Sequence, residues 1–566
     1  MCQHRRMPQM YVGGRIFTAD PDRPWAEALL IDGDRIAAVG SVAECLAAAS
    51  TLPGDHDDHG DQGVDSHDDA AVEQVDVTGC VVMPGFVDGH SHLLMTGSAL
   101  GMAQLRTATS LEEIRRRLVE WAEANPESPY VLGTSFLFDA LPNNEPTRQM
   151  LDDLFPDRPV FIDSFDLHCG WVNSAALGVM EITADTPDPI GGEIRRDPST
   201  REATGYLLET ALHTHMYALL GRADDATRDR HLATAMTALN ESGTTTAVDM
   251  AVGPADADTF TRAEQNDSLT LRVIGHWIIR NTGDIATDLA QVHEAIRRKA
   301  QHTGPMFRIA GIKLIVDGTI DACTAAMVDP YTNDTNCAPI WPAASLNPVV
   351  ELADQLGLQV ACHAIGDLAV RIAIDAIERA QRVNGTSDRR HRIEHLEYAD
   401  AADIPRLGAL GITASMQPVH CDPSIAGNWA EMLGPERAPE GFNWPGYLDT
   451  GATLAFGTDT PTAPHMPLPN MYIGATRRSP TEPHLEPTRP DFALPVDETI
   501  IHGTRDAAWA SFEEDRLGII KVGACADLVV IDDDPFANGP EALLTAKVRR
   551  TVVGGRLVHT AGDTAG

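Results

Sequence analysis

Eight short apolar segments, most of them separated by a single helical pattern, constrain the fold of this chain more than any other feature. They are residues 81–89, 244–250, 271–277, 308–318, 358–364, 391–396, 411–418 and 452–459. Strands that alternate with helices form parallel sheets, and eight of them are the number that closes a (β/α)₈, or TIM, barrel. The sequence therefore predicts an α/β protein built on such a barrel.

The segments outside this pattern predict the remaining units. About 150 residues separate the first two strands, so we expect residues 100–230 to form an inserted α/β lobe over the barrel mouth, with the barrel itself formed by 81–99 and 231–489. Residues 1–80 and 490–566 contain short strands around turns, which predicts one composite β-sandwich made by both termini. Residues 54–70 are rich in Asp, and we expect a disordered acidic insert there.

Composition narrows the class of partner and the compartment. A formal charge of −39 repels nucleic acid and anionic membranes, so a small-molecule substrate is expected. No apolar run approaches the ~20 residues that span a bilayer. The nine cysteines contain no C-x-x-C pair, which favours free thiols in a reducing compartment and predicts a cytoplasmic protein. A homo-oligomer is compatible with the sequence, but no feature fixes its order.

Two H-x-H pairs occur, and their local structure separates them. His90 and His92 end the first predicted strand, where residues two apart point to the same face and can reach one metal at the barrel mouth. His213 and His215 lie in a helical pattern, where a two-residue step turns the side chains about 200° apart. We interpret the first pair as metal ligands and the second as structural.

Other metal-ligating residues end later strands. His363 ends the fifth, His395 the sixth and Asp459 the eighth, so all should lie at one end of the barrel with His90 and His92. Nitrogen and carboxylate donors suit zinc, and we expect one or two divalent ions.

Lys313 lies inside the fourth predicted strand, among apolar neighbours. An unpaired ammonium is costly to bury there, especially beside a divalent cation. Two interpretations remain open. The amine pairs with an acid such as Asp317, or it captures CO₂ and becomes a carboxylate-like bridge between two metals.

These motifs resemble the amidohydrolase superfamily, and in combination its amidohydrolase-3 (YtcJ-like) branch, which includes N-substituted formamide deformylase. The resemblance covers nearly the whole chain and is carried by PGFVDGHSHL, GIKLIVDGT, HAIGDLAV, RIEHLEY, FGTDTP, GIIKVGACADLVVIDDDP, PTRQMLDDLFPDRPVFI, DLHCGWVNSAAL and TAAMVDPY. It implies the barrel, the composite β-sandwich and a hydrolase that cleaves a non-peptide C–N bond in an amide-like substrate. The deformylase activity does not transfer directly, because Asp321-Ala322-Cys323 stands where the wider family often has Gly-Ser-Arg.

The resemblance also implies roles for individual residues. His90 and His92 match the first-strand ligands, Lys313 the carbamylated bridge, and His363 and His395 the ligands of the second metal. Asp459 matches the ligand that also serves as the catalytic proton shuttle. Zinc lowers the pKa of bound water towards ~7, so we expect a hydroxide to attack the amide carbonyl while Asp459 carries the proton to the leaving nitrogen.

Substrate contacts are expected from the lobe and from later loops. Asp166, His168 and Trp171, in SFDLHCGWVNS, resemble a family motif usually written DGH, and His168 ranks first among them. His420 and His276, after the seventh and third strands, are further candidates to face the pocket.

Two alternative functions remain from the sequence. A mononuclear deaminase on the same barrel usually has Glu three residues after the fifth-strand histidine, where this chain has Gly366, followed by Asp367. A catalytically silent barrel that serves as a binding module typically loses metal ligands, and this chain keeps the whole set.

Overall fold

The computed structural model describes residues 7–52 and 72–562, so the predicted acidic insert at 54–70 lies outside the described residues. Eight parallel strands form the central sheet, in the order β21-β20-β19-β18-β17-β16-β15-β8. They are β8 (Phe86–Ser91), β15 (Thr244–Val252), β16 (Arg272–Ile278), β17 (Phe307–Ile315), β18 (Gln359–Ala364), β19 (Arg392–His395), β20 (Thr413–Met416) and β21 (Leu454–Phe456). Each predicted strand segment overlaps one of these strands, which confirms the predicted barrel.

Backbone hydrogen bonds just beyond the ends of β8 and β21 join the first and last strands. The amide of Asp459 donates to the carbonyl of His90 at 2.8 Å, and the amide of His92 donates to the carbonyl of Thr460 at 3.0 Å. These bonds bring the two ends of the sheet together at the carboxyl edge, where barrel enzymes place their active sites.

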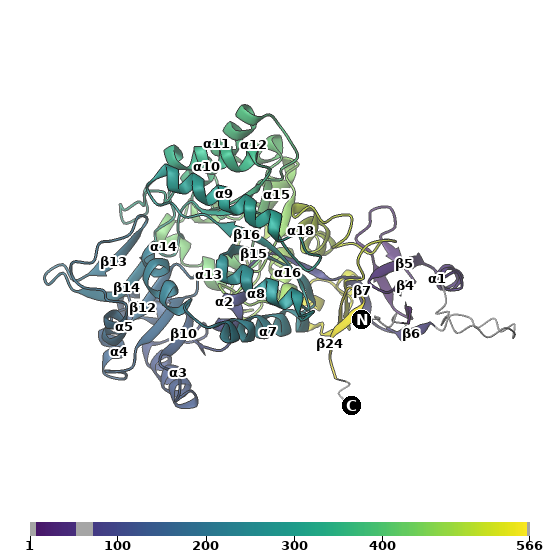
Figure 1. Ribbon diagram of the computed structural model, residues 1–566, viewed down its shortest axis with the longest axis horizontal. Helices are drawn as coiled ribbons and strands as arrows, with labels where there is room; N and C mark the ends of the chain where they lie inside the picture. The colour runs from purple at the N-terminus through teal and green to yellow at the C-terminus, as the bar shows by residue number, and fades with distance from the viewer. Residues whose placement is uncertain (1–6, 53–71, 563–566) are drawn as a thin grey trace.

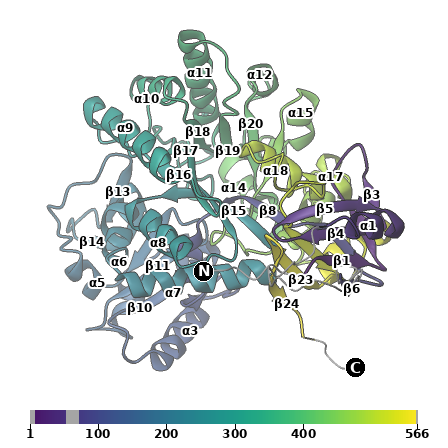
Figure 2. The same ribbon diagram turned by 45° about the vertical axis from the view of Figure 1, so that its right-hand side comes forward.

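Helices surround the strands (Figure 2). They include α7 (Asp225–Glu241), α8 (Pro254–Gln265), α9 (Ile285–Gln301), α10 (Ala343–Gln355), α11 (Asp367–Asn384), α12 (Ile404–Leu410), α15 (Trp444–Asp449) and α16 (Pro467–Thr476). Helix α11 shows the pattern: Ala369, Ala373, Ile377 and Ala380 recur at steps of three or four residues and are fully buried.

Two further sheets are built from the ends of the chain, which lie side by side at one end of the molecule (Figure 1). One has the order β24-β23-β22-β7-β2-β3 and the other β5-β4-β1-β6. Their strands are β1 (Gln9–Val12), β2 (Arg15–Phe17), β3 (Trp25–Ala26), β4 (Ala28–Asp32), β5 (Arg35–Gly40), β6 (Glu73–Asp76), β7 (Val81–Pro84), β22 (Leu528–Ile531), β23 (Val548–Val553) and β24 (Arg556–Thr560). Leu29, Val75, Val82 and Leu528 are buried in one apolar cluster that both sheets share.

The structure differs from the predicted boundaries near residues 81 and 490. The apolar segment 81–89 is not one barrel strand, because Val81–Pro84 pairs with β2 and β22 in a terminal sheet. Gly85 allows the break, since a Cβ at this position would collide with Thr245. After residue 490, α17 (Val496–His502) and α18 (Arg505–Ala510) precede the terminal strands, and Ala507 and Ala508 of α18 pack against the barrel.

The segment after β8 forms a separate lobe on the opposite side of the barrel from the terminal sheets (Figure 1). Its sheet has the order β13-β14-β12-β11-β10-β9 and carries its own apolar core. The lobe contains β9 (Ala103–Gln104), α3 (Leu111–Ala124), β10 (Val131–Phe136), α4 (Gln149–Asp152), β11 (Val160–Ser164), β12 (Cys169–Val172), α5 (Ser174–Val179), β13 (Gly192–Arg196) and β14 (Ala203–Glu209). Helix α2 (Leu93–Ala99) links it to the barrel.

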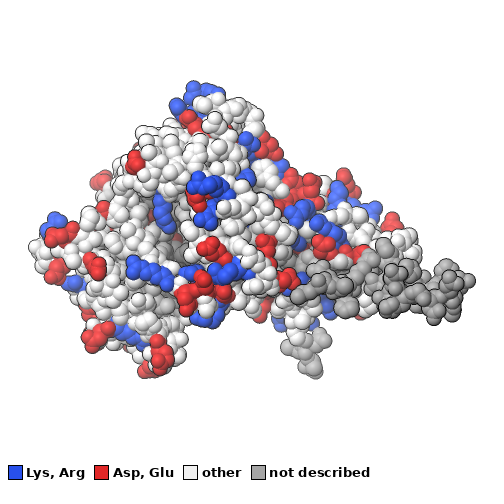
Figure 3. Space-filling view, in the orientation of Figure 1, with Lys and Arg blue, Asp and Glu red and all other residues white. Residues whose placement is uncertain are grey.

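Two further properties of the described residues concern membrane spans and surface charge. None of their helices combines the length and the apolar character needed to cross a membrane. On the face shown in Figure 3, acidic and basic side chains are interspersed.

Candidate metal centre and active site

Three predicted ligands from the first and last strands meet at the barrel mouth. Nε2 of His90 lies 3.3 Å from Oδ1 of Asp459, and Nε2 of His92 lies 3.2 Å from the same oxygen. Asp459 follows β21 in the left-handed backbone region, with φ 57°. A non-glycine residue is uncommon there and is found mainly where the surrounding structure holds it, often at functional sites.

The two remaining histidines lie beside this group. Nδ1 of His395 is 3.9 Å from Oδ2 of Asp459, and its ring centroid lies 4.5 Å from that of His363 and 4.8 Å from that of His90. Nitrogen and oxygen atoms of His90, His395 and Asp459 all lie within 4.8 Å of one another, a spacing that can hold a metal ion. His395 itself has φ 78° at the end of β19.

Unsatisfied polar atoms show that this donor set fits a cation. Oδ1 of Asp459 and Nδ1 of His92 are buried and have no hydrogen-bond partner among the described residues. Buried polar atoms without such partners are costly, and binding of a cation or water would satisfy them. Burial lowers the pKa of His90 to about 4, which keeps its imidazole in the neutral form that binds metals. The site therefore suits a divalent ion.

Lys313 reaches the same centre from β17. Its Nζ lies 3.5 Å from Nε2 of His90, and burial lowers the pKa of the amine to about 8. Asp317, the acid considered as its partner, accepts backbone N–H groups from Ile365, Gly366 and Ala326 at 2.9–3.0 Å. The structure thus does not show the pairing of Lys313 with Asp317.

Glu394 orients the ring of His90, and it is not among the residues predicted from the sequence. His90 donates Nδ1–H to Oε2 of Glu394 at 2.7 Å, which leaves Nε2 free for a metal. Burial alone would raise the pKa of Glu394, but Arg392 at 2.6 Å and the bond to His90 hold it well below its usual value. The available signal was the position of Glu394, next to the predicted ligand His395 in RIEHLEY.

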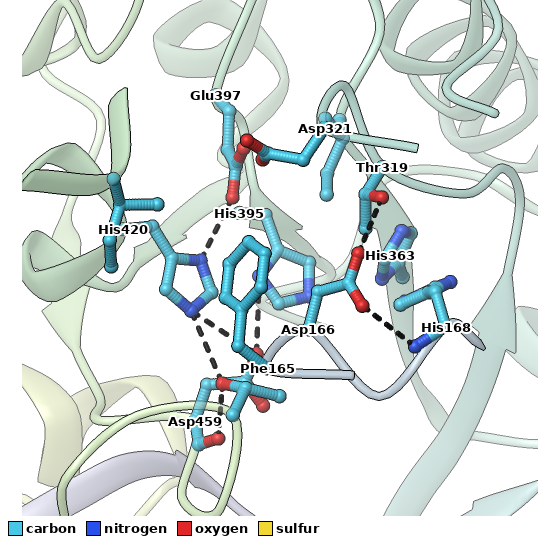
Figure 4. Close-up of a pocket in the computed structure, with 13 residues that line it drawn as sticks. Phe165, Asp166, His168, Thr319, Asp321, His363, His395, Glu397, His420 and Asp459 are labelled. Atoms are coloured by element: carbon cyan, nitrogen blue, oxygen red, sulfur yellow. Dashed lines mark hydrogen bonds and ion pairs between the residues drawn. The ribbon is translucent and has the colours of Figure 1, made fainter. Parts of the chain in front are cut away.

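A cavity opens above the centre (Figure 4). It encloses about 450 Å³, open space at its mouth included, and its lining comprises Phe165, Asp166, His168, Thr319, Asp321, His363, Ile365, His395, Glu397, His420, Ile425, Asp459 and Thr462. Six residues predicted to bind metal or substrate therefore share one cavity: His168, His363, His395, His420, Asp166 and Asp459.

His420 occupies the side of the cavity nearest Asp459 (Figure 4). Its Nδ1–H donates to Glu397 at 2.8 Å, and its Nε2 lies 3.6 Å from Oδ2 of Asp459. Burial lowers the pKa of His420, but Glu397 outweighs that effect and raises it overall.

The lobe contributes His168 and Asp166 on the other side. His168 donates Nδ1–H to Glu209 at 2.6 Å, and this carboxylate outweighs burial to raise the pKa of His168 to about 9. Asp166 accepts the hydroxyl of Thr319 at 2.8 Å and the amide of His168 at 3.2 Å. Asp166 thus joins the lobe to the barrel at the cavity wall.

Several predicted contacts do not reach this cavity. Trp171 lies fully buried in the core of the lobe, where its indole N–H donates to the carbonyl of Thr147 at 2.9 Å. His276 is buried within β16 and bonds Gln359 at 2.9 Å. Asp367 accepts the amides of Val328 and Leu368 instead of facing the cavity.

The second H-x-H pair does not line this cavity. His213 and His215 lie in a π-helical turn, Leu212–Tyr217, and the ring of His213 contacts that of Tyr217.

A second, larger cavity adjoins the first between lobe and barrel. It holds about 1280 Å³, open space included, and Phe165, Asp321 and Ile425 line both cavities. The outer cavity is also lined by Phe138, Tyr206 and Met432. Room therefore exists beyond the metal centre for a bulky part of a substrate.

Histidine and carboxylate donors at the carboxyl end of an eight-stranded parallel barrel define a metal-dependent hydrolase. The chain belongs to the amidohydrolase family, because the family model described as Amidohydrolase family matches residues 73–559. This match confirms the resemblance found in the sequence. The chain is accordingly a hydrolase that acts on carbon–nitrogen bonds other than peptide bonds, and its family implies a divalent metal.

Individual relatives agree with this assignment. The chain is 29% identical to the putative amidohydrolase YtcJ of Bacillus subtilis, over 86% of this chain and 90% of that protein. It is 27% identical to the N-substituted formamide deformylase of Arthrobacter pascens, over 97% of each. An uncharacterized metal-dependent hydrolase from Pyrococcus furiosus superimposes with a TM-score of 0.71 at 26% identity, covering 94% of this chain and 100% of that one.

Proposed function

We propose that this enzyme hydrolyses a small N-substituted amide of the formamide type, using water activated by one or two zinc ions. The observation that supports it most is the contact of one carboxylate oxygen of Asp459, a residue that lines the cavity, with both His90 and His92. The similarity to the formamide deformylase supports the substrate class.

The residues present would hold the metal in a definite way. His90, His92 and Asp459 would hold one ion and His363 and His395 a second, and Lys313 would contribute to the same centre. Zinc suits these nitrogen and oxygen donors, and when bound it supplies a Lewis acid that polarises a carbonyl and lowers the pKa of water.

Asp459 would carry the proton of the reaction. Water adds to the amide carbon, its proton passes to a carboxylate oxygen of Asp459, and the same proton then moves to the nitrogen as the C–N bond breaks. The products are a carboxylic acid and an amine. Although burial raises its pKa, His90 and His92 hold the pKa of Asp459 well below its usual range, so the carboxylate begins the cycle ionised.

Lys313 is proposed to act as a carbamate. Its unprotonated amine would add to CO₂ and lose one proton, which would give a carbamate whose oxygens are suited to bind the metal ions. The burial of Lys313 beside His90 and the separate engagement of Asp317 support this second interpretation.

The two adjoining cavities support a substituted substrate. The scissile group would lie above Asp459 with His168 and His420 on either side, and the substituent would pass Phe165 and Ile425 into the outer cavity. Apolar walls with a few polar groups are typical of small-molecule sites.

A substrate panel tests the proposal. Zinc-loaded enzyme is offered N-substituted formamides, larger N-substituted amides, cyclic amides and amino-substituted heterocycles, and the release of amine and of ammonia is measured separately. We expect amine release from the formamides, and its loss on chelation. Ammonia release from the heterocycles alone would favour the deaminase, and no turnover by zinc-loaded enzyme would favour a binding module.

A further inference from the structure

Two histidine–glutamate pairs flank the metal centre on opposite sides. His420 and Glu397 belong to the barrel, whereas His168 and Glu209 belong to the lobe. In both pairs the imidazole donates Nδ1–H to the carboxylate, at 2.8 and 2.6 Å. Such a bond fixes the orientation of an imidazole ring and the nitrogen that it presents on its other side.

The pair in the lobe leaves one nitrogen for a ligand. Nδ1 of His168 is taken by Glu209, and no hydrogen bond of its Nε2 is found within residues 7–52 and 72–562. The ring lines the cavity and its centroid lies 5.1 Å from that of His363 (Figure 4). The short bond from His168 to a buried carboxylate favours the protonated ring, which carries a hydrogen on both nitrogens, so a substrate held above the metal centre would meet Nε2–H.

Several contacts hold the loop that carries His168. Leu167 adopts φ 60°, a conformation that needs support in a residue with a side chain. Asp166 supplies that support by accepting the amide of His168 at 3.2 Å and the hydroxyl of Thr319 at 2.8 Å. One hydrogen bond within the loop and one to Thr319 of the barrel thus hold the loop in place.

Glu209 is equally constrained. It ends β14 with φ 51°, and its amide donates to the carbonyl of His168 at 2.7 Å. Its side chain is about 6% exposed, and Oε1 is buried without a hydrogen-bond partner among the described residues. Gly318 of the barrel lies against this oxygen, where any Cβ would collide with it. The carboxylate is therefore held in place by its surroundings and makes its hydrogen bond through Oε2 to His168.

We propose that Glu209 is a positioning residue that fixes His168 so that Nε2–H donates a hydrogen bond to the carbonyl oxygen of the substrate. The orienting part of this inference stands on the structure alone, and the contact with substrate rests on the proposed function. A preorganised donor of this kind stabilises the negative charge that develops on the oxygen as water adds.

Proton NMR tests the orienting part without any substrate. An N–H held in a short bond to a carboxylate resonates far downfield, and the His168 signal is assigned by its loss in His168→Ala. We expect Glu209→Gln to shift that signal upfield, because a neutral acceptor makes a weaker bond. The matched control is Glu193→Gln, an exposed glutamate on the adjacent strand β13, which should leave the signal unchanged.

Kinetics test the contact with substrate. We expect His168→Ala to lower kcat by about 10²-fold, the usual loss of one such donor, and Glu209→Gln by about tenfold, with smaller changes in KM. The double variant should be no slower than His168→Ala alone, because Glu209 acts through His168. Zinc content should match that of the Glu193→Gln control in every variant.

Each result bears on one part of the inference. An unshifted NMR signal in Glu209→Gln overturns the orienting role, whatever the activity. A shifted signal with additive kinetic losses, or with full activity in His168→Ala, overturns the contact with substrate. If wild-type enzyme turns over no amide, the NMR result still decides the orienting role and the failure belongs to the proposed function.

Discussion

Oδ1 of Asp459, just beyond the last barrel strand, lies 3.3 Å from Nε2 of His90 at the end of the first. The contact exists because the sheet closes on itself and brings the two ends of the barrel sequence to one edge. It makes Asp459 the residue most suited to share a metal with His90 and to move a proton above it.

Replacement of Asp459 should abolish most of the activity while leaving the fold. We expect Asp459→Asn to lower kcat by about 10²–10⁴-fold, because an amide cannot accept the proton of the attacking water. Steady-state kinetics on the best amide of the panel measures the effect. Asp449→Asn, the same substitution at an exposed position in α15, is the control, and equal activity of the two variants would contradict the shuttle role.

Removal of the Lys313 amine should cost a metal ion. We expect Lys313→Ala to lose zinc and activity, and small carboxylic acids added to the buffer to restore part of both by replacing the carbamate. Metal analysis with and without added acid measures this. Lys299→Ala is the control, since its amine bonds only the carbonyl of Gly357 among the described residues. Full activity of Lys313→Ala without additives would remove the bridging role.

Glu394 offers a test of the support beneath the ligands. We expect Glu394→Gln to weaken zinc binding or activity about 10–100-fold, because the bond at 2.7 Å to His90 loses its charge. Competition for zinc with a chelator of known affinity gives the binding constant. Unchanged affinity and unchanged kcat together would show that Glu394 does not support the metal site.

A buried ion pair links the barrel to the terminal sheets. Arg272 donates to both oxygens of Asp527, at 2.7 and 3.1 Å, and the two side chains are 7% and 2% exposed. Loss of one partner leaves an uncompensated charge, so we expect Asp527→Asn to destabilise the protein by about 3–5 kcal/mol.

Chemical denaturation compares this variant with a surface control. Asp267→Asn removes the acid of the pair between Arg556 and Asp267, whose side chains are 33% and 91% exposed, and should cost less than about 1 kcal/mol. Equal, small losses in the two variants would mean that the Arg272–Asp527 pair does not stabilise the junction.

The barrel, and the position of several histidines and Asp459 at its mouth, were largely predictable from sequence because they depend on local patterns. Apolar segments of strand length fixed the eight strands, and polar residues at their carboxyl ends fixed His90, His363 and Asp459 as neighbours. The break at Gly85 was not predictable, since Val81–Pro84 and Phe86–Ser91 form one continuous apolar run whose halves pair with different sheets.

The surroundings of the centre depend on contacts between distant segments, which no local pattern encodes. Glu209 reaches His168 because β14 and β12 pair in the lobe, and the sequence gives no reason to associate them. The resemblance of SFDLHCGWVNS to a family motif predicts a substrate contact for Trp171, but alternation along β12 turns its ring into the core of the lobe.

Metal content and its coupling to activity test the central claim most directly. Protein purified without added chelator is analysed for zinc per chain, stripped with a chelator, assayed, and assayed again after zinc is restored. We predict one or two zinc ions per chain, loss of amide hydrolysis on stripping and its return with zinc. Protein that binds no stoichiometric zinc, or that hydrolyses amides equally well after stripping, would contradict the account.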